Sequence, residues 1–132
     1  MRLSRLDHLV LTVANIDRSV AFYAGVLGME PVTFGEGRTA LRFGEQKINL
    51  HGPDLPILPR AAKPTPGSAD LCFLLDVPLE DVVSRLTRLG VPLESGIGEH
   101  DGATGPLRSV CLRDPDGNLI ELSNRVMHVP EH

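Results

Sequence analysis

Two stretches of the sequence decide the fold: LDHLVLTVANIDRSVAFYAGVLGME at residues 6–30 and RDPDGNLIELSN at residues 113–124. Residues 6–13 alternate in polarity and are rich in β-branched side chains, which predicts a strand. The next segment has the three-to-four spacing of an amphipathic helix, set by Ile16, Val20, Tyr23 and Leu27. In the second stretch, Asp116-Gly117 predicts a two-residue hairpin turn between the last two strands.

The order of elements in the first half recurs in the second half. After the first helix, we expect strands at residues 30–34, 39–43 and 47–51. The second half repeats this order with a strand at 69–77, a helix over 79–89, and strands at 91–94, 108–113 and 118–124. A shift of 62 positions superposes Gly28 on Gly90, and the closing triplets Ile48-Asn49-Leu50 and Ile120-Glu121-Leu122 also correspond.

This repetition predicts an α+β domain over residues 1–132, built from two βαβββ modules. The modules span about residues 5–51 and 69–124, and a proline-rich linker at 52–68 joins them. The five prolines of the linker exclude a helix or a central strand there.

The composition of the 132-residue chain is that of a globular protein. Hydrophobic residues make up 42% and charged residues 23%, which excludes a disordered or membrane-spanning chain. The formal net charge is −4 and no basic run is present, so we expect no nucleic-acid partner. Cys72 and Cys111 form no CxxC motif, and the N-terminus lacks the long apolar core of a signal peptide. We therefore expect a cytoplasmic protein whose partner is a small molecule.

Polar residues interrupt the apolar strands at corresponding positions of the two halves. The repeat aligns His8 with Asp70 and Asn49 with Glu121, and His51 lies two residues beyond Asn49 on the same strand face. A polar side chain inside an apolar strand costs free energy unless it has a partner. Imidazole and carboxylate groups are donors for zinc, nickel, manganese or iron(II). The pattern therefore predicts one divalent metal ion per chain.

The two stretches quoted first resemble the vicinal oxygen chelate superfamily, which includes glyoxalase I, extradiol dioxygenases and fosfomycin- and bleomycin-resistance proteins. ALRFGEQKINLH (residues 40–51) and KPTPGSADLCF (residues 63–73) look closest to a small glyoxalase-like subgroup sometimes labelled virulence-associated. The resemblance implies that the two modules form an incomplete barrel around one metal ion, which binds adjacent oxygens of the substrate.

By position, the resemblance makes His8 the first-strand ligand and Glu121 the last-strand carboxylate. Asn49 stands where glyoxalase I has a glutamate, and Asp70 stands where a histidine is common. Because imidazole is a better metal donor than a neutral amide, we take His51 as the third ligand, with Asn49 and Asp70 as alternatives. Glu121 is the expected catalytic base, with Asp70 in reserve.

Three functions fit these residues. The first is a glyoxalase-like lyase or isomerase, in which the ion polarises two neighbouring oxygens and a carboxylate moves a proton between carbons. The second is an extradiol-type dioxygenase, because two histidines and a carboxylate suit non-haem iron(II). Its further acid/base histidines could come only from His100, His128 and His132. The third is a drug-binding resistance protein with no catalytic activity.

The sequence also predicts a homodimer, because paired half-barrels leave a sheet edge and an apolar face that a second copy can cover. Sedimentation at micromolar concentration should report about twice the 14.3 kDa of one chain. A monomer under these conditions would contradict the prediction.

Overall fold

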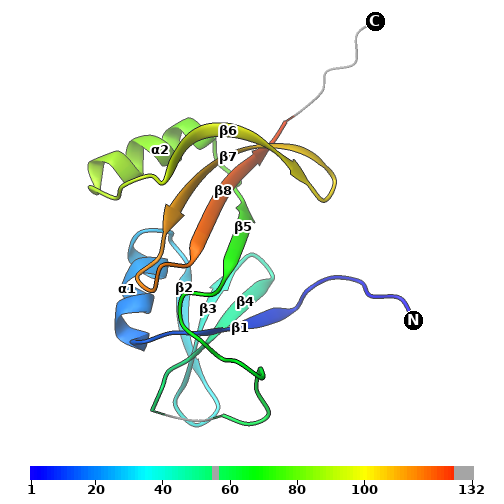
Figure 1. Cartoon of the computed structure of the whole chain (residues 1–132), viewed down its shortest axis with the longest axis vertical. Helices are drawn as coiled ribbons and strands as arrows, with labels where there is room; N and C mark the ends of the chain where they lie inside the picture. The colour runs from blue at the N-terminus through cyan, green and yellow to red at the C-terminus, as the bar shows by residue number, and fades with distance from the viewer. Residues whose placement is uncertain (55–56, 127–132) are drawn as a thin grey trace, which may run out of the picture. The chain divides into compact units, whose positions relative to one another are not determined.

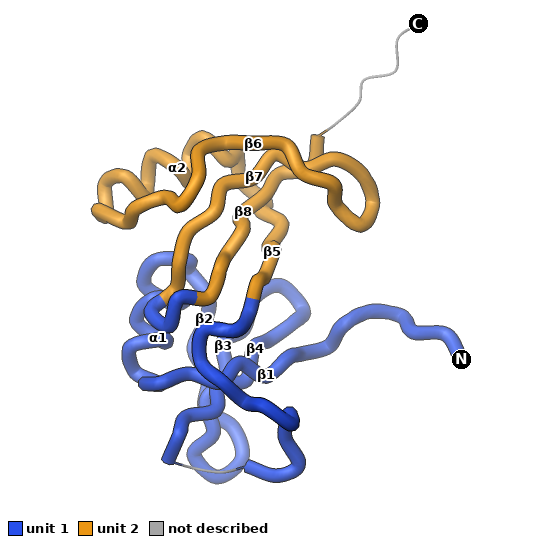
Figure 2. Tube along the Cα trace, in the orientation of Figure 1, with its two compact units in different colours: residues 1–69, 115–117 blue, residues 70–114, 118–132 orange. Residues whose placement is uncertain are grey.

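The computed structural model describes residues 1–54 and 57–126 of the chain. Pro56 of the linker, His128 and His132 lie outside the described residues. The chain divides into two compact units (Figure 2). Unit 1 comprises residues 1–69 and 115–117, and unit 2 comprises residues 70–114 and 118–132.

Unit 1 is a four-stranded sheet with one helix (Figure 1). Its elements follow in the order β1 (His8–Thr12), α1 (Ile16–Gly25), β2 (Glu30–Phe34), β3 (Arg38–Phe43) and β4 (Gln46–His51). The strands lie side by side in the order β1-β4-β3-β2. The first strand pairs in parallel with the last, and the other pairs are antiparallel.

Unit 2 repeats this topology. Its elements are β5 (Asp70–Leu74), α2 (Leu79–Arg88), β6 (Ser95–Gly102), β7 (Gly105–Arg113) and β8 (Leu119–Arg125). Their order in the sheet is β5-β8-β7-β6, with β5 again parallel to β8. The predicted α+β class and the two βαβββ modules are therefore confirmed.

Short-range signals account for the ends of both helices. The Asn15 side chain accepts a hydrogen bond of 2.9 Å from the Arg18 backbone N–H and so begins α1. After the helices, Gly28 and Gly90 adopt positive φ values of 76° and 70°, which a glycine takes without strain. In the described residues, neither helix is long and apolar enough to span a membrane.

Each helix covers one face of its own sheet. In unit 1, α1 packs on β2 and β3 and buries Tyr23 completely. In unit 2, α2 packs on β7 and β8 through Leu79 and Leu86. Successive side chains along each strand point to opposite faces of the sheet. One face packs beneath the helix, and we call the other the helix-distal face. The sheet residues beneath the helices include Leu11, Leu41, Ile48, Val110, Leu112 and Ile120, all buried.

Some predicted features of the second module were wrong. The strand expected at residues 91–94 lies further along, because β6 spans Ser95–Gly102. The glycine-rich segment at residues 96–105 supplies most of β6, which pairs antiparallel with β7. Cross-strand hydrogen bonds form this hairpin despite the poor strand propensity of its glycines and charged residues. The turn between β7 and β8 is also longer than two residues, because Arg113 pairs with Leu119.

Glycine is required at the end of β6. A Cβ atom at Gly102 would lie 2.8 Å from the Gly105 carbonyl oxygen and 2.8 Å from the Leu107 Cγ. We expect Gly102→Ala to lower the free energy of unfolding by about 1–3 kcal/mol through this overpacking. Gly96→Ala is the matched control on the same strand, because a Cβ there meets no atom within 4 Å.

Urea denaturation of both variants tests this expectation. Gly96→Ala should leave the free energy of unfolding within about 0.5 kcal/mol of wild type. Equal stability of the two variants would contradict the close approach at Gly102.

Candidate functional site

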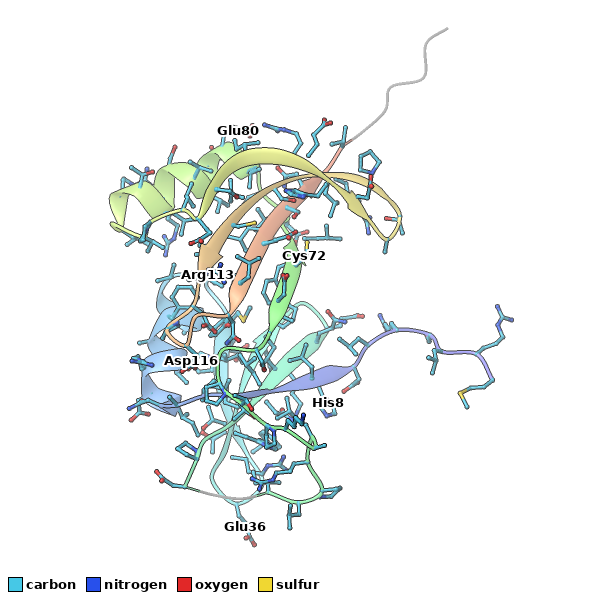
Figure 3. All side chains as sticks on the ribbon, in the orientation of Figure 1. His8, Glu36, Cys72, Glu80, Arg113 and Asp116 are labelled. Carbon is cyan, nitrogen blue, oxygen red and sulfur yellow. The ribbon has the colours of Figure 1, made fainter. Side chains whose placement is uncertain are left out.

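His8 is the first residue of β1 (Figure 3), and the preceding residue supplies a carboxylate partner. Its Nδ1 lies 2.8 Å from an Asp7 carboxylate oxygen, and this hydrogen bond is the main reason why the pKa of Asp7 is lowered. A carboxylate that accepts from Nδ1–H leaves Nε2 with its lone pair available, which is the usual arrangement of metal-binding histidines. The His8 side chain is 44% exposed, so Nε2 is accessible to a ligand.

Asn49 and His51 lie on β4 and share the helix-distal face with His8. The register pairs Val10 with Asn49 and Thr12 with His51. Asn49 is 4% exposed and His51 is 9% exposed. The Asn49 Oδ1 and the His51 Nε2 are both buried without a hydrogen-bond partner in the part of the chain that the structure describes. Buried polar atoms without partners are costly, so both atoms are candidates for contact with a ligand.

The environment of His51 favours a neutral imidazole. Burial is the main cause that lowers the pKa of His51 below 6.5, and the positive charges of Arg38 and Arg60 add to it. A neutral imidazole is the form that binds a metal ion. The same shift shows that two arginines lie close to this ring.

The two proposed histidine ligands lie at opposite ends of this face. His8 pairs with Lys47, four residues before His51 on β4, which corresponds to roughly 13 Å along the strand. Asn49 is only two residues from the position opposite His8. His8 and His51 of one chain can therefore hold one ion only if each side chain extends toward the other.

Glu121 lies on the helix-distal face of the second sheet, between two cysteines. The register pairs it with Cys72 of β5 on one side and with Cys111 of β7 on the other. Burial raises the pKa of the Cys72 thiol, the hydrogen bond with Ser123 opposes that shift, and the charge of Glu121 adds to it. Asp70 shares this face and pairs with Leu119, two residues before Glu121.

A short polar chain beside Glu121 was missed by the sequence analysis. The Cys72 Sγ lies 3.3 Å from the Ser123 Oγ, which lies 2.6 Å from the Ser109 Oγ. The signal was present in the alternation, because Ser123 follows Glu121 by two residues and Ser109 precedes Cys111 by two. Both serines are completely buried and satisfy each other.

The candidate ligands are divided between the units. His8 and His51 belong to unit 1, whereas Asp70 and Glu121 belong to unit 2. Within residues 1–54 and 57–126, no three histidine, cysteine, aspartate or glutamate side chains form a group that could hold a metal ion. His100 lies on β6 and is exposed.

The sequence of this chain matches a known superfamily. The profile of the Glyoxalase/Bleomycin resistance protein/Dioxygenase superfamily matches residues 5–122, and the chain belongs to this superfamily. This membership confirms the resemblance that the two sequence stretches indicated.

Individual relatives include bacterial and fungal proteins. The chain is 52% identical to the virulence protein STM3117 of Salmonella typhimurium, over 96% of this chain and 88% of that protein. The crystal structure of STM3117 superposes with a TM-score of 0.94 and covers 96% of this chain and 100% of the other. The glyoxalase domain-containing protein RDO1 of Mycosarcoma maydis is 47% identical over 90% of this chain and 67% of its own length. A lactoylglutathione lyase from Agrobacterium tumefaciens is 27% identical, with a TM-score of 0.72 over 93% of this chain and 95% of the other.

The His51 environment generates a prediction about pH. In metal-free protein, the ring signals of His51 should titrate with a midpoint below 6.5 in an NMR experiment, because burial disfavours the imidazolium. Since the folded pKa lies below the unfolded one, this group contributes stability that is lost as pH falls below about 6.5. His51→Gln should therefore reduce the loss of unfolding free energy between about pH 7 and about pH 5. A midpoint at or above 6.5 would contradict the prediction.

Proposed function

We propose that the protein is a metal-dependent enzyme of glyoxalase type that acts on a small substrate through two adjacent oxygens. The observation that carries this proposal is the Asp7–His8 pair at the first-strand ligand position of the superfamily. An aspartate that orients a histidine, and leaves its Nε2 available, is a typical feature of metal sites. Membership of the superfamily and the similarity to a lactoylglutathione lyase support the same reaction class.

The proposed ligands are His8, His51 and Glu121. The donor set of two imidazoles and one carboxylate fits zinc, nickel, manganese or iron(II). The unpartnered Nε2 of His51 and its lowered pKa support its place in this set. The separation of His8 and His51 along their sheet keeps Asp70 as the alternative third ligand, in which case His51 belongs to the wall of the site.

A bound divalent ion would polarise two neighbouring substrate oxygens and acidify the adjacent C–H bond. Glu121 is the proposed base: its carboxylate takes the proton from one carbon and returns it to the next. Burial keeps the pKa of the neighbouring Cys72 raised, so its thiol remains protonated at neutral pH and does not compete as a base. Asp70, on the same face, is the reserve base.

An extradiol-type dioxygenase is the second candidate, favoured by the facial two-histidine, one-carboxylate donor set. This donor set is typical of non-haem iron(II) oxygenases. Oxygen uptake with a catechol by the iron(II)-loaded protein, measured with an oxygen electrode, separates this candidate from the first.

Metal binding tests the proposed ligands. Calorimetry with zinc, nickel, manganese and iron(II) should find about one ion per chain, and Glu121→Gln and His8→Ala should each weaken binding at least about tenfold. Asn49→Ala is the matched control, because a neutral amide on the same strand contributes little to the affinity.

The metal affinity of His51→Ala distinguishes the two candidates for the third ligand, His51 and Asp70. A large loss of affinity would support His8, His51 and Glu121, whereas an affinity like wild type would support Asp70 in place of His51. If the wild-type protein binds none of the four ions, both enzymatic proposals fall and a binding protein without catalysis is favoured.

A further inference from the structure

Three buried polar atoms without partners lie together at one end of the first sheet. They are the Arg38 Nε, the Asn49 Oδ1 and the His51 Nε2. The register pairs Ala40 with Asn49 and Thr39 with Leu50, so Arg38 lies beside His51 and shares its helix-distal face. A cluster of this kind in a folded protein is costly unless a ligand satisfies it.

The charge at this end is positive and is not balanced by a carboxylate. The register of β3 and β4 places Arg38 opposite His51, and Arg60 lines the same cavity as His51. Neither arginine forms an ion pair in the described part of the chain.

The Arg38 guanidinium is held in position before any ligand binds. Its central carbon lies 4.8 Å above the Phe34 ring, a cation–π contact that limits the freedom of the side chain. The Lys47 ammonium lies 3.9 Å from the same ring and adds to the positive potential. A guanidinium fixed in this way loses little entropy when it binds a carboxylate or a phosphate.

A small cavity lies beside His51 and Arg60. It has a volume of about 120 Å³, and its lining includes Thr12, His51, Arg60, Pro64 and Pro66. Part of the proline-rich linker thus forms a wall over the end of β4 and brings Arg60 to the cavity. The volume suits a compact polar group rather than a ring system.

The second module provides an internal comparison. Its positions corresponding to Arg38 and His51 are Ser109 and Ser123, which pair across the strands. The two serine hydroxyls are only 2.6 Å apart and satisfy each other. In unit 2 the two side chains at this position therefore satisfy each other. In unit 1 the Arg38 Nε and the His51 Nε2 have no hydrogen-bond partner among the described residues.

We propose that this end of the first sheet binds a compact oxyanion group of the substrate, with Arg38 and Arg60 as its donors. The proposal deepens the proposed function by naming the substrate class: a small organic acid, or a phosphate ester or phosphonate. A guanidinium binds both kinds of oxyanion through paired N–H groups.

The test uses metal-free protein and two probes, succinate and inorganic phosphate, added at constant ionic strength. Backbone NMR signals of residues around Thr12, His51 and Arg60 should shift and saturate with at least one probe. Tighter binding of succinate identifies a carboxylate, and tighter binding of phosphate identifies a phosphate ester or phosphonate. The absence of saturable shifts with both probes would overturn the proposal.

Variants separate a specific site from general positive charge. Arg38→Gln should raise the dissociation constant at least about tenfold, because it removes a charge-assisted donor. Arg38→Lys retains the charge but loses the planar fork, so its affinity should fall between those of Arg38→Gln and wild type. Arg42→Gln is the matched control on the same strand and face, four residues away, and should change the constant less than about twofold.

An equal loss of oxyanion affinity in Arg38→Gln and Arg42→Gln would contradict a specific site at Arg38. Because oxyanion binding is measured without metal and without turnover, a negative result here is independent of the test of the proposed metal site. Binding of a divalent ion without binding of an oxyanion would support the metal site and contradict the oxyanion site. Binding of an oxyanion without binding of a metal ion would support the oxyanion site and contradict the proposed metal-dependent enzyme.

Discussion

The parallel pairing between the first and last strand of each module is the constraint on which the rest of the structure depends. In unit 1 it sets β1 against β4, and in unit 2 it sets β5 against β8. A parallel pair requires a crossover, and the helix and two strands between the paired strands supply it. The same pairing brings polar residues that are about forty to fifty positions apart in the sequence onto one face. Without the pairing of β1 with β4, His8 and Asn49 would not lie near each other on one face of the sheet.

The two modules use this shared geometry differently. In unit 2, Ser109 and Ser123 satisfy each other, and Glu121 is the acidic group of the face. In unit 1, the corresponding positions hold Arg38 and His51, whose buried nitrogen atoms have no partner in the described residues. The two modules therefore differ at this shared position, where unit 1 has an arginine and a histidine and unit 2 has two serines.

Local patterns predicted most of the fold. The alternation of residues 6–13, the cap at Asn15 and the glycines at 28 and 90 each depend on neighbouring residues only, so they could be recognised in the sequence. The strand β6 could not, because its glycines and charges have low strand propensity and it forms only through pairing with β7. The polar positions could be recognised by alternation, but the separation of His8 from His51 required the register. Arg38 was indistinguishable from Arg42 in the sequence, since only the burial of its Nε and its position opposite His51 make it different.

The central claim is that His8 and Glu121 hold one divalent ion. Anomalous diffraction from crystals of the manganese- or nickel-loaded protein, recorded at the absorption edge of the metal, locates that ion directly. The account predicts one peak per chain, within about 2.0–2.3 Å of a His8 Nε2 and of a Glu121 carboxylate oxygen. The third protein ligand of that peak would also distinguish His51 from Asp70. A peak whose ligands include neither His8 nor Glu121, or no peak at full metal loading, would contradict it.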